Sequence, residues 1–149
     1  MFQRATSALA IVAICGSLGC ASSFFDPSGR LNSLENAQRE YTKLIRWGEI
    51  RRAAVYVEPD YREDFLGYVE TFEQIRITDA DYDPLGLDPS DGRAEVEVVY
   101  HAYSLATLQE KRIVEVQAWT RHDGMKNNWL VRPEIASIVE AFHANAAGN

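Results

Sequence analysis

Alternating acids are the first residues in this sequence whose types and spacing suggest chemistry. The acids of this segment are Asp79, Asp81, Asp83, Asp88 and Asp91, and Gly86 lies among them. An EF-hand loop binds calcium through oxygen ligands at similar spacing, but it needs glycine at its sixth position and glutamate at its twelfth. Counted from Asp79, those positions hold Pro84 and Ser90. We therefore expect no metal here, and interpret the acids as the solvent-facing side of a strand that leads into a loop.

Histidines and nucleophiles give no stronger signal. His101, His122 and His143 are too scattered to suggest a zinc triad, and no cysteine follows position 20 to join them. The chain has no Gly-x-Ser-x-Gly elbow and no phosphate-cradling glycine pattern. We assign no catalytic residue, no metal and no cofactor from these patterns.

The first nineteen residues have the pattern of an export signal. Arg4 and the amino terminus supply positive charge, and Ala8 to Cys15 form an apolar stretch of eight residues. A bilayer-spanning helix needs about 20 apolar residues. A charged start, a short apolar stretch and then small residues are typical of a secretory signal peptide, which is excluded from the fold.

The segment Ser17-Leu18-Gly19-Cys20 resembles the lipobox of bacterial lipoproteins. That family usually has leucine three places before the cysteine, where this chain has Ser17. The resemblance implies that residues 1–19 are removed and that Cys20 becomes the diacylated first residue, anchored in the membrane of the cell envelope. Because Ala21 and not aspartate follows Cys20, it also implies the outer membrane, facing the periplasm. The alternative is ordinary cleavage near Gly19 or Ala21, which releases a free periplasmic or secreted protein.

Composition fits a small anchored domain. The 149 residues are 46% hydrophobic, which excludes a disordered chain and allows one modest domain. Both cysteines lie within the first twenty residues, so no disulfide staples the rest. Removing residues 1–19 leaves 14 basic and 22 acidic residues, a balance that disfavours nucleic-acid binding. Residues 20–31 are interpreted as a tether, 32–143 as the domain and 144–149 as a flexible tail.

Helical periodicity dominates the first half of the domain. Asn32 and Glu35 have the spacing of a capping box, and Gly48 is expected to end the first helix. A short second helix is expected over residues 49–58, although a strand at Val55 remains open. Pro59 is expected to start a third helix. The apolar stripes expected to face the core are Leu34, Ala37, Tyr41, Leu44 and Ile45, then Ile50, Ala53, Ala54 and Val57, then Tyr61, Phe65, Tyr68, Val69 and Phe72.

After Phe72 the period changes to two, which predicts half-buried antiparallel strands. Asp123-Gly124 is expected to turn the chain into a strand over residues 129–132, and Pro133 to end it. An amphipathic segment follows over residues 135–142. The strand residues expected to face the helices are Ile75 and Ile77, then Ala94, Val96, Val98, Tyr100 and Ala102, then Val114, Val116 and Ala118.

This order of elements, α+β with N-terminal helices before a curved antiparallel β-sheet, resembles the NTF2-like (cystatin-like) fold. The segment Arg46 to Ile50 between helices and the late strand carrying Trp129-Leu130-Val131 fit that layout. The resemblance covers residues 32 to about 133, and it implies a cone-shaped domain. It implies little about function, because one fold hosts many activities.

Two function classes follow. The favoured one is a non-enzymatic binding or assembly module. Its candidate interface is the sheet face away from the helices, which is expected to display Val99, Tyr103, Ile113 and Trp119 and to pair with a second copy or an envelope protein. The alternative for that face is a C-terminal segment folded back over it.

The other class is a small isomerase-like or hydratase-like enzyme with polar residues in the cone. Its candidate cluster, His101 with Tyr103, Glu95 and Glu97, is expected on the outer face. An ionisable group with a perturbed pKa that projects into an apolar cavity would favour this class, whereas a binding module can have a filled or neutral interior.

Overall fold

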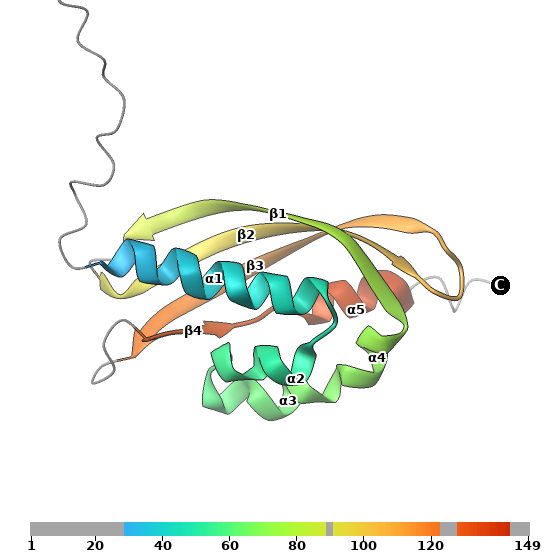
Figure 1. The fold of residues 1–149 in the computed structure, drawn as a ribbon, viewed down its shortest axis with the longest axis horizontal. Coiled ribbons are helices and arrows are strands. Elements are labelled where there is room, and N and C mark those ends of the chain that lie inside the picture. Colours follow the sequence, from blue (N-terminus) through green and yellow to red (C-terminus); the bar gives the residue numbers. More distant parts are fainter. Residues whose placement is uncertain (1–28, 89–90, 123–127, 144–149) are drawn as a thin grey trace, which may run out of the picture.

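The computed structural model describes residues 29–88, 91–122 and 128–143, and places helices before one four-stranded antiparallel sheet (Figure 1). The α+β class predicted from the sequence is therefore confirmed. The helices and strands are α1 (Arg30–Arg46), α2 (Ile50–Ala53), the 3-10 turns η2 (Ala54–Tyr56) and η3 (Pro59–Tyr61), α3 (Arg62–Gly67), α4 (Val69–Glu73), β1 (Ile75–Asp88), β2 (Arg93–Ser104), β3 (Glu110–His122), β4 (Asn128–Arg132) and α5 (Ala136–His143). The leader, the lipobox with Cys20 and the Asp123-Gly124 turn lie outside the described residues.

Helix α1 buries the predicted stripe, with Tyr41 and Ile45 at 0% exposure. It begins earlier than the capping box predicted: Gly29 is the N-cap, and Asn32 lies inside the first turn. Its end at Gly48 is confirmed. Gly48 has a φ of 71°, its N–H donates to the Ile45 carbonyl, and the Glu49 N–H donates to the Leu44 carbonyl. This is the Schellman geometry for which glycine is favoured.

The segment between α1 and the sheet forms short helices. The predicted third helix is broken at Tyr68 into α3 and α4, which still bury Phe65 and Phe72. Tyr61, the first residue of the predicted stripe, is 37% exposed and lies outside the core. Val57 forms a parallel bridge to Val131 of β4. This bridge ties the helical segment to one edge of the sheet.

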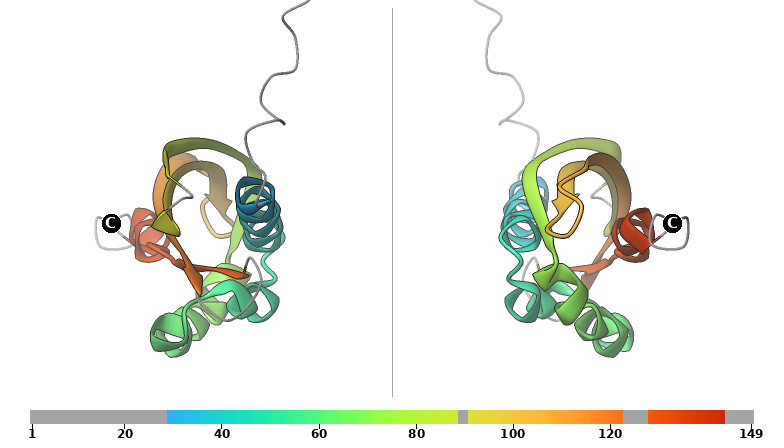
Figure 2. Two further views of the ribbon diagram at one scale, coloured as in Figure 1. Left: turned by 90° about the vertical axis from the view of Figure 1, so that its left-hand side faces the viewer. Right: turned by 90° about the vertical axis from the view of Figure 1, so that its right-hand side faces the viewer.

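The sheet runs in the order β1-β2-β3-β4 and curls strongly when viewed end-on (Figure 2). Helix α1 contacts both edge strands, β1 and β4. A twisted antiparallel sheet curves naturally, and a helix that reaches both of its edges closes the concave face. The core therefore lies between α1 and the concave face.

Strand β1 is longer than the sequence predicted. The expected loop around residues 84–88 is instead the end of the strand, and the pairing with β2 is irregular between Pro84 and Gly86. Proline is tolerated because β1 is an edge strand, where one side of the backbone makes no ladder bonds. The prediction that Asp79, Asp81 and Asp83 face solvent is confirmed, since all three are exposed.

The prediction for the two faces of β3 is wrong. Ile113, Glu115, Gln117 and Trp119 are all buried, whereas Val114, Val116 and Ala118 are half-buried or exposed. Residues paired across an antiparallel ladder share a face, and Val98 of β2, itself 0% exposed, pairs with Glu115. Alternation of apolar residues selected the wrong face because the register with β2, and not the count of apolar residues, sets which side of β3 is buried.

The C-terminal amphipathic segment is confirmed as α5, and it packs against β3. Lys111 shares the concave face with Ala102, and its ammonium donates to the Ala141 carbonyl and lies over the Phe142 ring. Ile138 is 0% exposed and belongs to the main core. Helix α5 therefore extends the inner core, and the expected alternative of a C-terminal cover over the outer face is not what α5 forms.

Candidate functional site

The centre of the concave face carries a buried carboxyl. Glu115 lies in the middle of β3 and is 0% exposed, as are its strand neighbour Gln117 and Tyr100 on β2. The register places Glu115 opposite Val98, with Tyr100 opposite Ile113. A fully buried glutamate is rare unless its polar atoms are partnered. This cluster is therefore the place in the described structure where chemistry is most concentrated.

Hydrogen bonds converge on one oxygen of this carboxyl. The Tyr100 hydroxyl donates to Glu115 Oε2 at 3.0 Å, and Gln117 Nε2 donates to the same oxygen at 2.8 Å. The Trp119 indole N–H donates to Gln117 Oε1 at 3.3 Å, which fixes the orientation of the amide. Together, Tyr100, Glu115, Gln117 and Trp119 form a polar chain that runs along the inside of the sheet, hereafter the Glu115 cluster.

The environment favours the neutral acid. Burial raises the pKa of Glu115 above its ordinary value, and the nearby Glu134 carboxylate adds to the rise. The hydrogen bonds from Gln117 and Tyr100 and the backbone N–H of Glu134 oppose this rise in pKa without cancelling it. Burial, followed by the charge of Glu115, likewise raises the pKa of Tyr100 well above its ordinary value.

Helix α1 forms the opposite wall of the cluster. The Tyr41 ring meets Trp119 edge-on at 5.8 Å between centroids, and Gln38 Nε2 donates to Thr42 Oγ1 at 2.9 Å. Tyr41 is fully buried, and its pKa is raised by burial and then by the charge of Glu115. Edge-to-face aromatic contacts of this kind stabilise by about 0.5–1.5 kcal/mol beyond the area they bury.

Two polar atoms in this interior have no hydrogen-bond partner. They are the Tyr41 hydroxyl and Glu115 Oε1, each on a fully buried side chain. A protonated carboxyl offers one donor and a phenol offers one donor and one acceptor, so the two groups are complementary. Chemically, the cluster can hold a proton, release it or pass it on. The members of the cluster are at most 1% exposed, so a substrate reaches them only if the packing around them opens.

The outer face of the sheet carries two of the four candidate interface residues. Val99 and Tyr103 lie there and are half-buried. Val99 pairs with Val114, which is 37% exposed, and Val116 lies on the same face. The other two candidates were misplaced: Ile113 and Trp119 are 5% and 1% exposed and face the core. The outer apolar strip, as the structure has it, is Val99, Tyr103, Val114 and Val116.

The candidate cluster of His101, Tyr103, Glu95 and Glu97 lies at alternate positions on the outer side of β2. His101 is on the outer side of β2, and its Nδ1 lies 3.4 Å from Glu110, across the ladder. Glu95 and Glu97, its expected partners, are further along the same strand. The described residues also contain no group of three or more His, Cys, Asp or Glu side chains that could hold a metal ion.

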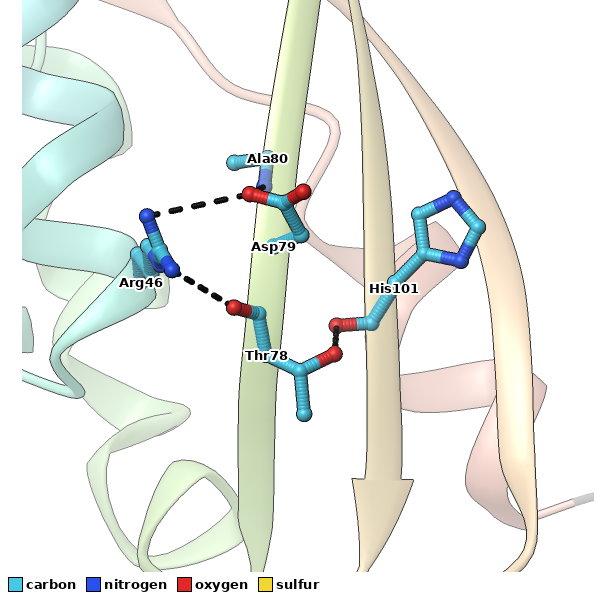
Figure 3. Close-up of polar contacts among 5 residues, drawn as sticks. All are labelled: Arg46, Thr78, Asp79, Ala80 and His101. Carbon is cyan, nitrogen blue, oxygen red and sulfur yellow. Dashed lines mark hydrogen bonds and ion pairs between the residues drawn. The ribbon is translucent and has the colours of Figure 1, made fainter.

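The rim between α1 and β1 is held by a separate set of contacts (Figure 3). Arg46 at the end of α1 donates to the Thr78 carbonyl at 2.6 Å and lies 3.7 Å from Asp79. Thr78 sits where the β1–β2 register shifts, and its hydroxyl donates to the His101 carbonyl at 3.0 Å. Arg46 thus partners a backbone group at the irregular edge of the sheet.

The alternation that predicts Val114, Val116 and Ala118 facing the helices places Glu115 on the other side of the strand, so sequence reasoning does not find it. One signal pointed the other way: Ile113, Glu115, Gln117 and Trp119 share a face, and Ile and Trp at its two ends favour burial.

Comparison with family models, with curated proteins and with solved structures found no match. Among the described residues, no helix is long and apolar enough to cross a membrane.

Proposed function

We infer that this protein is an envelope lipoprotein whose domain, of the NTF2-like (cystatin-like) type, acts as a non-enzymatic binding or assembly module. In this proposal residues 1–19 are a cleaved signal and Cys20 carries the lipid. The tether, predicted over residues 20–31, is shorter than predicted because α1 begins at Arg30, and it links the domain to the outer membrane on its periplasmic side. The lipobox-like Ser17-Leu18-Gly19-Cys20 segment supports the anchor. Two acyl chains give stable anchoring, at about 0.8 kcal/mol for each buried methylene.

The observation that carries the binding role is the contrast between a closed interior and an apolar strip outside. Glu115 and Tyr100 are sealed from solvent, so no ionisable group of the cluster is presented to a substrate. Val99 and Val114, by contrast, meet across the middle of the outer face and remain partly accessible. Contiguous apolar residues on an exposed face can mark an interaction surface, and this strip is the candidate on the described outer face. The proposed partner is a second copy of the chain or an envelope protein.

The NTF2-like assignment is supported by the shape of the domain. A strongly curved antiparallel sheet with a long helix across its concave face (Figure 2) fits a cone. The helices also precede the sheet in sequence, as the resemblance implies.

Metabolic labelling in a bacterium with an outer membrane tests the proposed lipid anchor on Cys20. The full chain is expressed with a palmitate analogue, and the N-terminal peptide is examined by mass spectrometry. The expected result is an acylated peptide that begins at Cys20, and the matched C20A chain incorporates no label. A native protein that begins at Met1, or an unlabelled protein in the soluble fraction, overturns the anchor.

A second candidate function, acid–base catalysis in the cone, is favoured by Glu115 alone. Its carboxyl is ionisable, faces the helices and has a raised pKa, as a general acid requires. A water-soluble carbodiimide distinguishes the two functions, with Glu95 as the exposed reference carboxyl. Modification of Glu115 in the folded chain means that small molecules reach it and favours the enzyme. Modification only after unfolding favours the binding module.

A further inference from the structure

The Glu115 cluster joins the parts of the domain that have to separate for the interior to open. Tyr100 belongs to β2, and Glu115, Gln117 and Trp119 belong to β3. Tyr41 of α1 packs edge-on against Trp119 of the cluster. Glu134, whose carboxylate and backbone N–H both act on Glu115, lies between β4 and α5. A change in charge at this one carboxyl therefore acts on the packing of α1 and α5 against the sheet.

The cluster is built for a neutral carboxyl and not for a charged one. Both side-chain donors, from Tyr100 and Gln117, reach Oε2, and Oε1 has none. The titratable and charged groups acting on this carboxyl are Tyr100 from β2 and Glu134 from the segment before α5, and Tyr41 from α1 feels its charge. Lys111 is on the same face of β3, but its ammonium is bound to the Ala141 carbonyl. None of the groups that shift the Glu115 pKa is a cation.

Ionisation leaves Oε1 as a buried charge with no side-chain donor, and the Glu134 N–H is the backbone donor that acts on this carboxyl. A buried ionised oxygen without a partner is strongly destabilising, so the structure rearranges or admits water. Among the described residues, the buried donors with no partner are the Tyr41 hydroxyl on α1 and Arg121 Nε near the end of β3. Of these two, Tyr41 feels the charge of Glu115, so it is the candidate donor. Either response, a turn of Tyr41 toward the carboxylate or entry of water, takes place at the contact between α1 and the concave face.

We propose that Glu115 is a proton-controlled latch: protonated, it holds α1 closed over the concave face of the sheet, and on losing its proton it loosens that contact. This goes beyond the proposed binding role and does not depend on the lipid anchor or on the outer face. It gives the domain a closed form under acidic conditions and a looser form as the pH rises.

The direction follows from linkage. A carboxyl whose pKa is higher in the folded chain than in the unfolded one stabilises the fold fully below the unfolded value, about 4.3 for glutamate. That stability is lost as the pH rises through the folded value. Each unit of difference between the two pKa values changes the folding equilibrium constant about tenfold.

Thermal unfolding of the full chain across about pH 4 to pH 8 is the first test. The native chain is expected to lose stability as the pH rises, relative to an E115Q variant that cannot ionise there. The matched control is E95Q, which removes the same charge from the exposed face of β2 and is expected to retain the native slope. The same slope in E115Q as in the native chain overturns the proposal.

Two readouts separate a latch from a general effect on stability. Amides of α1 near Tyr41 are expected to exchange hydrogen faster, after correction for intrinsic rates, once Glu115 is ionised. This gain is expected to be absent in E115Q.

If E115Q does not fold, Y41F replaces it. Loss of the unpartnered Tyr41 hydroxyl removes the donor on α1 that could turn toward the carboxylate, so the pKa of Glu115 is expected to rise and the titration of its carbon resonance to move to higher pH. Protection of α1 that does not change through that titration overturns the latch.

Discussion

The two faces of the sheet differ in whether their polar side chains contact water. On the outer face, acids such as Asp81 and Glu95 are exposed and surround a strip of partly buried valines. On the concave face, Glu115 and Gln117 are as deeply buried as Val98 beside them. The same residue types are therefore solvated on one side and sealed on the other.

The difference lies in what satisfies the polar atoms. Water does so on the outer face, where a charge costs little. On the concave face the side-chain partners of Glu115 and Gln117 are each other, Tyr100 and Trp119, and the Glu134 backbone N–H also acts on Glu115. A buried polar network stabilises a fold only when its members are satisfied, so two unpartnered atoms, Glu115 Oε1 and Tyr41 OH, mark the place where this interior responds to change.

The largest expected loss in the free energy of unfolding comes from a substitution on the concave face. W119A removes a side chain that is 1% exposed, packs edge-on against Tyr41 and donates to Gln117. Truncation of a buried tryptophan costs about 3–5 kcal/mol, measured as the free energy of unfolding in urea. Trp47, 67% exposed, is the matched control, and W47A is expected to stay within about 0.5 kcal/mol of the native chain. Equal losses for both variants would refute the burial assigned to Trp119.

Removal of the Tyr100 hydroxyl is expected to act in a pH-dependent way. Y100F deletes a donor that lowers the pKa of Glu115, so that pKa rises further. A hydrogen bond to a charged group contributes about 1.5–3 kcal/mol and a neutral one about 0.5–1.5 kcal/mol. Urea unfolding should therefore show a greater loss of stability above the folded pKa of Glu115 than below the unfolded one. A loss that is the same at every pH would mean that Tyr100 does not act through the Glu115 carboxyl.

The rim contact is expected to contribute less. R46A removes the guanidinium that donates to the Thr78 carbonyl and lies near Asp79, both at an exposed edge. Exposed ion pairs contribute about 0.2–1 kcal/mol, so a loss near the top of that range is expected in urea unfolding. R39A, an exposed arginine on the same helix, is the comparison. If R39A destabilises as much as R46A does, the link to β1 has no energetic role.

The smallest expected effect on stability is on the outer face, where association is the readout. V99K places a charge in the outer apolar strip, and the unfolding free energy is expected to change by no more than about 1 kcal/mol. Sedimentation of the detergent-solubilised full chain is expected to show loss of self-association or of partner binding. E95K on the same face is the control. A native chain that sediments as a monomer, with no partner lost in V99K, argues against the proposed interface.

Local patterns predicted much of the fold. The stripe of α1, its end at Gly48, the alternation of β2 and the helix α5 were all predicted and are confirmed. These features depend on neighbours within a few residues, which the sequence displays directly. Predictions for α3 and α4 and for the end of β1 failed in detail, because packing broke one helix at Tyr68 and extended one strand past Pro84.

The candidate site was not predictable in the same way. Strand β3 has two faces of equal local geometry. One carries Val114, Val116 and Ala118, and the other carries Ile113, Glu115 and Gln117, and alternation along the strand does not tell which of them is buried. Pairing with β2 decides between them, since Glu115 has to share the face of Val98. That choice depends on contacts between residues far apart in the chain.

The amino-acid sequence alone determined the order and type of most helices and strands. It also determined the excess of acidic residues, the absence of cysteine after position 20 and the lipobox-like segment. Which side of β3 faces the helices was decided only by tertiary structure, and with it the burial of Glu115 and Trp119. The physical reason is that periodicity defines two faces for a strand, but only the assembled core determines which face loses its water.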